Sequence, residues 1–190
     1  MPVEAGQEAP DFELPDQQRN KVKLSDYRGQ SNVALVFYPF TFTGVCQGEL
    51  CQLRDDIASF EAAGVQVLAV SCDSPFAQAK WAEEQHFNFP LLSDFWPHGE
   101  TSRAYGVFNE ALGCAMRHTF VIDIRWIGND EIVARGFERR EQIATQQPNA
   151  FLQAVIGDIS PGNFDGVLRK LDSVDLRLGK SQRGEDRETS

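Results

Sequence analysis

The stretch NVALVFYPFTFTGVCQGEL, residues 32–50, decides the fold of this chain. Its first part, Asn32–Tyr38, is a near-continuous run of apolar, β-branched and aromatic residues, which is typical of a strand buried on both faces. After the loop Pro39–Thr43, apolar residues recur at steps of four and three, at Cys46, Leu50, Leu53, Ile57 and Phe60. This spacing predicts an amphipathic helix that packs on a sheet, and we expect the helix to end at Gly64.

Strand and helix signals alternate along the chain on both sides of this stretch. Val65–Ser71 predicts a second buried strand, and Pro75 opens a helix that runs to His86. Shorter signals predict extended segments at Lys21–Leu24 and Phe89–Leu92, a short helix near Glu100–Tyr105, and a strand at His118–Ile122. The order of these elements predicts an α/β fold, in which helices cover both faces of a central sheet.

The pattern is weaker beyond Asp123. Candidate strands lie at 125–127 and 131–134, and candidate short helices lie at 148–156 and 164–171. No internal repeat or change in composition marks a domain boundary. We therefore expect a single domain over residues 1–178, followed by a polar, disordered tail at 179–190.

Composition excludes several classes of protein. The chain has 190 residues, 42% of them hydrophobic, which suffices for one core, and its net charge is -10. An acidic surface repels nucleic acids and anionic membranes, so we expect neither as a partner. The N-terminal residues lack the pattern of a signal peptide, and the longest apolar run, Val33–Phe40, is too short to span a bilayer. These features predict a cytoplasmic protein.

The four cysteines do not form a recognisable disulfide or metal-binding pattern. They lie at 46, 51, 72 and 114, without a C-x-x-C pair, and the three histidines show no ligand spacing relative to them. We therefore expect no metal site. The remaining possibility is a thiol placed for chemistry.

Cys46 is the candidate for that chemistry. It falls in the first turn of the predicted helix, where free backbone N–H groups and the helix dipole favour an anion such as a thiolate. Thr43 can place a hydroxyl beside the sulfur, and Pro39 ends the strand and shields one side of the site. Arg117 directly precedes the predicted strand 118–122, and it can reach the same end of the sheet. A thiolate surrounded by such donors suits cleavage of an O–O bond.

Each of these residues also has an ordinary structural interpretation. A cysteine on the apolar face of a helix is more often a small packed hydrophobe than a nucleophile. Proline and threonine are common in turns, and a single arginine usually lies on the surface. Spacing alone leaves the structural and the catalytic interpretations equally open.

Longer matches connect the chain to a known family. Pro39, Thr43 and Cys46 match the signature P-x-x-x-[TS]-x-x-C. Further matching segments are Ala9–Phe12, Phe37–Pro39, Phe95–Gly99, Ala104–Val107 and Thr119–Asp123. On these segments the chain resembles the peroxiredoxins, in particular their alkyl hydroperoxide reductase E branch, which is close to the bacterioferritin-comigratory (Q-type) branch. The resemblance covers about the first two-thirds of the chain. It is lost over residues 124–163, where we expect the least ordered part before the tail, and it returns at 164–174.

The resemblance implies a thioredoxin-like fold with a central mixed sheet, and the chemistry of a thiol peroxidase. In that family the cysteine that matches Cys46 is oxidised by the peroxide to sulfenic acid. The family roles of the other matched residues imply that Thr43 and Arg117 position and stabilise the peroxide, that Pro39 shields the site, and that Glu49 holds the arginine. The resemblance also implies hydrogen peroxide, organic hydroperoxides or peroxynitrite as substrates, a thioredoxin-like or low-molecular-weight thiol as reductant, no cofactor, and a homodimer.

Cys51 is a candidate resolving cysteine, because the Q-type branch has its resolving cysteine five residues after the peroxidatic one. In a continuous helix this offset puts the Cα atoms roughly 8–9 Å apart, whereas a disulfide needs them within about 7 Å. The helix must therefore unwind for the two to join. A one-cysteine cycle, with Cys51 inert, remains the alternative, and Cys72 and Cys114 are expected to be structural.

Two other functions compete with the peroxidase. A thioredoxin-like disulfide oxidoreductase would place a C-x-x-C pair at the corner between strand and helix, and this chain has none there. An inactive relative would lack the threonine or the arginine, and both are present. The sequence therefore favours a peroxidase.

Overall fold

The computed structural model describes residues 2–4, 7–123 and 133–137. The elements predicted at 125–127, 148–156 and 164–171, and the predicted tail, lie outside the described residues. The extent of the domain therefore stays a prediction.

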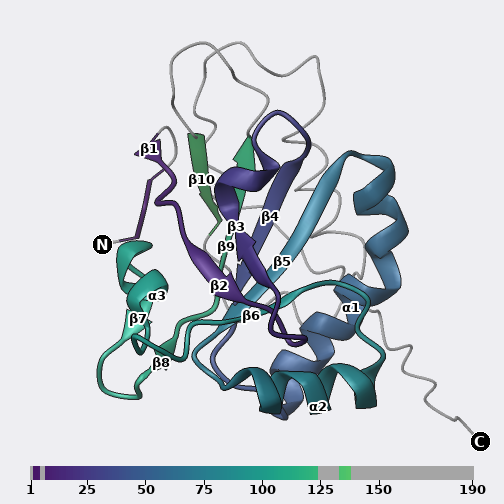
Figure 1. Ribbon diagram of the computed structural model, residues 1–190, viewed down its shortest axis with the longest axis vertical. Helices are drawn as coiled ribbons and strands as arrows, with labels where there is room; N and C mark the ends of the chain where they lie inside the picture. The colour runs from purple at the N-terminus through teal and green to yellow at the C-terminus, as the bar shows by residue number, and fades with distance from the viewer. Residues whose placement is uncertain (1, 5–6, 124–132, 138–190) are drawn as a thin grey trace, which may run out of the picture.

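A six-stranded mixed sheet forms the centre of the molecule (Figure 1). Its strand order is β1-β10-β9-β4-β5-β6. The strands β4 (Asn32–Phe37), β5 (Val65–Ser71) and β6 (Leu91–Ser93) run parallel. The strands β9 (His118–Asp123), β10 (Val133–Phe137) and β1 (Gln7–Glu8) extend the sheet by antiparallel pairing. The predicted thioredoxin-like fold with a mixed sheet is thus confirmed.

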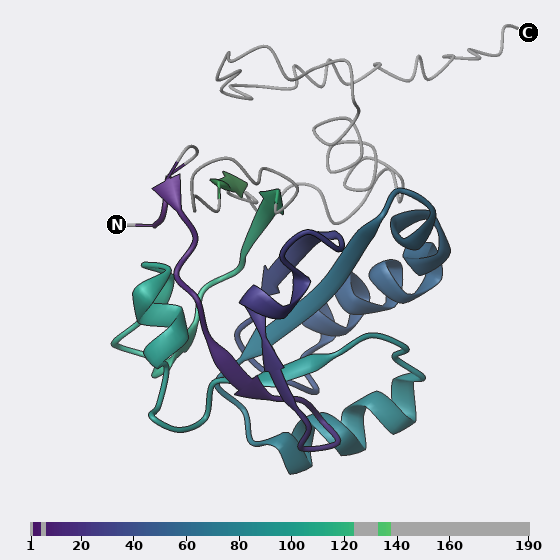
Figure 2. The same ribbon diagram turned by 45° about the horizontal axis from the view of Figure 1, so that its top comes forward.

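The two long helices share one face of this sheet. Residues of α1 (Gly44–Ala62) and α2 (Pro75–Gln85) form one core cluster with side chains of β4 and β5. A second cluster covers the opposite face, where the short 3-10 helix η1 (Leu24–Tyr27) and Tyr105, which caps α3 (Glu100–Ala104), pack on the sheet. Two hairpins complete the described chain: β2–β3 (Glu13–Pro15 and Lys21–Lys23) and β7–β8 (Phe108–Asn109 and Cys114–Ala115). Figure 2 shows the β2–β3 hairpin on the side of the sheet away from α1.

The longer predicted elements are confirmed close to their expected ends. Every residue of β4 is buried, and β5 has the predicted bounds. The helix α1 is followed by Gly64 at a φ of +69°, a conformation that favours glycine. In α2, Ser74 accepts a hydrogen bond from the N–H of Ala77 as the N-cap, with Pro75 at the start of the helix.

Short strands were harder to predict. The sequence does not predict β1 and β2, which have two and three residues. The strand β10 overlaps the end of the candidate strand 131–134, and it lies in the stretch expected to be least ordered. It forms because the adjacent strand β9 offers a free edge for pairing, which the local sequence does not reveal.

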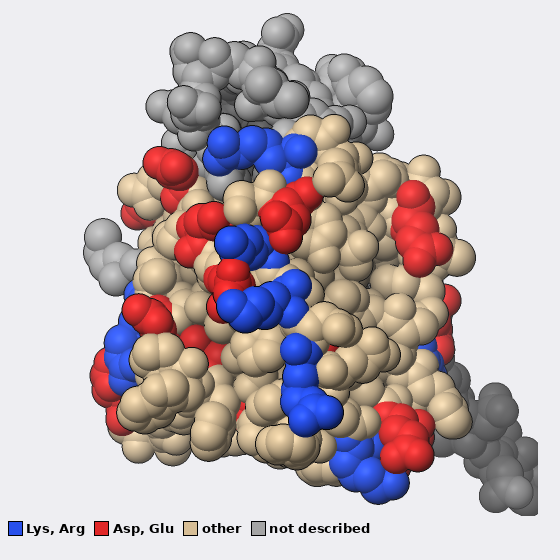
Figure 3. Space-filling model, viewed as in Figure 1, with Lys and Arg blue, Asp and Glu red and all other residues tan. Residues whose placement is uncertain are grey.

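Charges of opposite sign lie close together on the face that carries the β2–β3 hairpin. Figure 3 shows Lys and Arg side chains next to Asp and Glu side chains down the middle of this face. Lys21 and Lys23 both pair with Glu13, and their hydrogen bonds lower the pKa of that carboxyl.

Across residues 2–4, 7–123 and 133–137, no helix is long and apolar enough to cross a membrane. The same residues contain no group of three or more His, Cys, Asp or Glu side chains that could hold a metal ion.

Candidate active site

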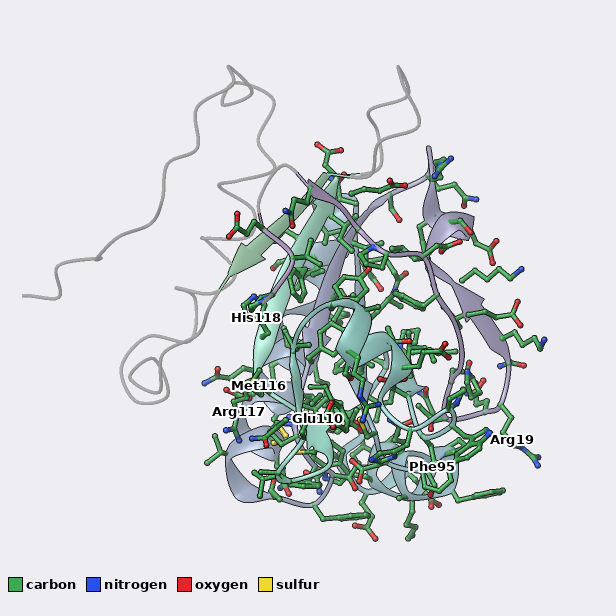
Figure 4. The ribbon with its side chains drawn as sticks, turned by 90° about the vertical axis from the view of Figure 1, so that its left-hand side faces the viewer. Arg19, Phe95, Glu110, Met116, Arg117 and His118 are labelled. Atoms are coloured by element: carbon green, nitrogen blue, oxygen red, sulfur yellow. The ribbon has the colours of Figure 1, made fainter. Side chains whose placement is uncertain are left out.

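The pairing of β4 with β9 builds the site. Phe37, the last residue of β4, lies opposite His118, the first residue of β9. The chain leaves β4 for the loop 39–43 and the start of α1, and Arg117 lies directly before β9. The start of α1 and Arg117 therefore meet at one end of the sheet, and Figure 4 shows Met116, Arg117 and His118 following one another where β9 begins.

Cys46 lies at this meeting point and is fully buried. It occupies the third position of α1, within the turn whose N–H groups have no partner inside the helix. Arg117 Nη2 donates a hydrogen bond to Cys46 Sγ over 3.2 Å. Arg117 Nε donates to Glu49 Oε2, also over 3.2 Å. The predicted residues Cys46, Arg117 and Glu49 thus form one connected group.

The charges in this group reinforce one another. Burial lowers the pKa of Arg117, but the charges of Cys46 and Glu49 and their hydrogen bonds outweigh burial, so the pKa is raised overall. A positively charged guanidinium is thus held against the sulfur of Cys46. Glu49 orients the guanidinium towards the sulfur.

Thr43 and Pro39 enter the site from the loop. Thr43 is the N-cap residue of α1, but its side chain makes no capping hydrogen bond. Its hydroxyl donates instead to the carbonyl of Phe40 over 3.0 Å, inside the loop. With its hydrogen used in this way, the hydroxyl oxygen can accept a hydrogen bond from a bound molecule. Pro39 is half-buried directly after the fully buried Tyr38.

The loop is also tied to the segment that follows β5, a contact that the sequence does not predict. The N–H of Thr41 donates to Asp73 Oδ2 over 2.8 Å. Phe42 has a φ of +60°, and its ring lies 6.1 Å from that of Trp81, between centroids. The polar residues that follow β5 were the available signal, because the carboxyl ends of parallel strands meet at one edge of a sheet.

Cys51 faces away from this group. Its sulfur contacts Gln85 Oε1 at 3.8 Å, at the end of α2. Arg54, one turn further along α1, donates to the carbonyl of the same glutamine over 2.6 Å. Since α1 is continuous from Gly44 to Ala62, Cys46 and Cys51 can join only if this helix opens, as expected from the spacing.

Cys72 and Cys114 have the properties of structural thiols. Both are buried. Burial raises the pKa of Cys72 to about 11, and burial together with the charges of Asp73 and Cys46 raises the pKa of Cys114. Neither thiol is ionised near neutral pH, so both are weak nucleophiles in this fold.

Large apolar side chains are exposed at several places along the described chain. They comprise Phe40, Phe42, Val45, Phe76, Phe95, Trp96, Leu112 and Met116. Trp96 is the most exposed of them, at 82%. We call this group the apolar rim.

Comparisons with known proteins show which proteins this chain resembles. A family model described as the AhpC/TSA family matches residues 5–127. Alkyl hydroperoxide reductase E of Mycobacterium tuberculosis is 54% identical over 121 residues, which cover 64% of this chain and 79% of the relative. Peroxiredoxin Bcp of Escherichia coli is 40% identical over 109 residues, 57% of this chain and 68% of the relative. The crystal structure of peroxidoxin BcpB from M. tuberculosis superposes with a TM-score of 0.69 and 31% identity, over 83% of this chain and 96% of that one.

Proposed function

Because the chain belongs to the AhpC/TSA family, we propose that Cys46 is the residue with which it reduces hydroperoxides. The chain is a thiol-dependent peroxidase of antioxidant defence, as its peroxiredoxin relatives indicate. The observation that carries the assignment to Cys46 is the 3.2 Å hydrogen bond from Arg117 to its sulfur, at the start of α1. The other three cysteines lack this combination of an arginine donor and a position in the first turn of a helix.

The reaction follows from the arrangement of these groups. The Cys46 thiolate attacks one peroxide oxygen, an S–O bond forms, and the O–O bond breaks. The sulfur becomes a sulfenic acid, and the other oxygen leaves as water or an alcohol after taking up a proton. Arg117 and the N–H groups of the first helical turn stabilise the negative charge that develops on the oxygens. Thr43 accepts the hydrogen bond of the peroxide O–H, and Pro39 limits access of water.

Hydrogen peroxide and organic hydroperoxides are the proposed substrates. The M. tuberculosis relative is called alkyl hydroperoxide reductase E, and an alkyl hydroperoxide is an organic hydroperoxide. A thiol reductant, thioredoxin-like or of low molecular weight, returns the enzyme to the thiol state. The proposed location is the cytoplasm.

Cys51 is the proposed resolving residue. Its thiol attacks the sulfur of the Cys46 sulfenic acid, a disulfide forms, and water leaves. Its thiol is half-buried beside Gln85, the last residue of α2, so solvent reaches it in part. Disulfide formation requires α1 to open, and the free energy needed to open this helix limits the rate of the step.

The apolar rim supports a homodimer. A second copy of the chain that packs on Trp96 and Leu112 would bury both side chains. The same group of exposed residues includes Phe40, Phe42 and Val45, which lie close to Cys46 in the sequence.

Intact-mass analysis tests the proposed function. One equivalent of peroxide should add one oxygen to the protein in the first seconds, and the Cys46→Ser variant should add none. The same variant should lose rapid peroxide consumption, because a serine hydroxyl stays protonated at neutral pH. Retention of most of the rate by Cys46→Ser would exclude Cys46 as the reacting residue.

A further inference from the structure

The loop 39–43 brings Thr43 to the peroxide site, and its conformation is an unusual one. Phe42 has a positive φ, which residues other than glycine rarely adopt unless their surroundings hold them. Thr41, next to it, is buried, and its N–H donates to Asp73 Oδ2 over 2.8 Å. Asp73 thus holds the backbone one residue before Phe42 and two residues before Thr43.

Asp73 is itself held by a buried network. Ser71 Oγ donates to the same carboxylate oxygen over 2.9 Å, and Gln78 Nε2 donates to Ser71 Oγ over 3.1 Å. Ser71 and Gln78 are fully buried. Ser93 Oγ donates to the backbone carbonyl of Asp73 over 2.6 Å. The carboxylate therefore has a fixed position relative to β5, β6 and α2, and it transmits this position to the loop.

The charge of Asp73 gives no benefit to a nearby thiolate. Burial raises the pKa of Cys114 most, and the charges of Asp73 and Cys46 raise it further, so both groups lie near Cys114. A negative carboxylate in this neighbourhood repels a thiolate rather than stabilising it. The contribution of Asp73 to the site is therefore one of geometry, through its hydrogen bond to Thr41.

We propose that Asp73 is a positioning residue for the peroxide, which acts by fixing the loop that carries Thr43. The proposal rests on the proposed function of Cys46 and extends it to a residue on another strand. Asp73 does not touch the peroxide. It sets where the Thr43 oxygen lies when the O–H of the peroxide binds, while Arg117 sets the reactivity of the sulfur.

Two reactions of the same thiol separate positioning from activation. Peroxide must be oriented between Cys46 and the loop, whereas iodoacetamide alkylates an available thiolate without needing Thr43. The Asp73→Ala variant should therefore react about 10- to 100-fold more slowly with peroxide, and its rate of alkylation at Cys46 should stay within about threefold of the wild type. Asp73→Asn retains an oxygen that can accept from Thr41, and it should recover most of the peroxide rate.

Asp16→Ala is the matched control. Asp16 also holds a loop through a carboxylate that accepts backbone N–H groups, those of Gln18 and Asn20. Figure 4 shows Arg19, in the same turn, on the opposite side of the molecule from Arg117. This variant should leave both rates unchanged. If Asp73→Ala does not fold, Asp73→Glu replaces it, because the extra methylene displaces the carboxylate and should give the same selective loss.

Three outcomes overturn the proposal. The first is a peroxide rate that does not change in the folded Asp73→Ala or Asp73→Glu variant. The second is an equal loss of the peroxide and alkylation rates, which would assign Asp73 to activation of the thiol. The third is an Asp73→Asn variant as slow as Asp73→Ala. Failure of the proposed function would look different, since Cys46→Ser would then retain the peroxide rate.

Discussion

Arg117 donates a hydrogen bond to the sulfur of Cys46 over 3.2 Å, although 71 positions separate the two residues in the sequence. The contact exists because β9 runs antiparallel to β4, so that the residue before β9 reaches the helix that follows β4. Glu49, one turn after Cys46 in α1, holds the same guanidinium from the other side. One cation thus contacts both the sulfur of Cys46 and a carboxylate.

Replacement of Arg117 should weaken the site without unfolding it. We expect Arg117→Met to slow peroxide reduction, because the substitution removes about 2–4 kcal/mol of transition-state stabilisation. Because the cation favours the thiolate, its removal should also shift the midpoint of the pH–rate profile to higher pH. Stopped-flow measurement of the peroxide rate between pH 4 and about 9 checks both effects.

Arg103→Met is the control for this experiment. Arg103 also pairs with a glutamate, Glu110, but its guanidinium lies over the ring of Phe108 rather than beside the sulfur of Cys46. This variant should retain the wild-type rate and midpoint. A wild-type pH–rate profile for Arg117→Met would remove Arg117 from the mechanism.

Alkylation of the native protein should distinguish the thiols. The raised pKa values of Cys72 and Cys114 keep both thiols protonated below about pH 9, so iodoacetamide should spare them. Cys46, which has an arginine donor, should react first. Peptide mapping before and after denaturation measures the order, and rapid labelling of Cys72 in the folded protein would contradict its raised pKa.

Resolution by Cys51 should be much slower than attack on the peroxide. Opening the first turns of α1 loses several backbone hydrogen bonds, each worth about 0.5–1.5 kcal/mol. It also withdraws the fully buried Leu50 from the core, at about 1.5–3 kcal/mol. Sulfenic acid should therefore accumulate and then disappear as the disulfide forms, and Cys51→Ser should leave it trappable or over-oxidised.

Peptide mapping of the oxidised protein decides between the two cycles. A Cys46–Cys51 disulfide supports resolution within the chain. If Cys46 is found as a stable sulfenic acid, or joined to Cys114 or to an external thiol, Cys51 takes no part and the one-cysteine cycle holds.

The dimer should depend on the apolar rim. Sedimentation equilibrium should give twice the mass of the chain for the wild type, and Trp96→Ser together with Leu112→Ser should shift the population towards the monomer. Both side chains are exposed in the single chain, so their replacement should leave its fold intact. As a control, Leu53→Ala removes a buried side chain and should lower the stability by about 2–5 kcal/mol without a specific effect on association. A wild type that sediments as a monomer would exclude the dimer.

The sequence by itself determined the parts of the protein that depend on local pattern. Apolar runs of six or seven residues predicted β4 and β5, because a strand buried on both faces has few polar positions. The periodicity after Thr43 predicted α1, Pro75 predicted the start of α2, and the motif from Pro39 to Cys46 pointed to Cys46 as the candidate reacting cysteine. These signals are carried by neighbouring residues, so they can be read without the fold.

Only the tertiary structure decided which distant groups meet. The strand β1 has two residues and β10 has five, and both depend on a partner strand rather than on their own propensity. The hydrogen bond from Thr41 to Asp73 joins the segments that follow the parallel strands β4 and β5, and the two residues are 32 positions apart in the sequence. The direction of Cys51 towards Gln85 follows from how α1 packs beside α2. Contacts of this kind arise from the packing of whole elements, because hydrogen bonds form wherever the sheet brings a donor and an acceptor together, whatever their separation in the sequence.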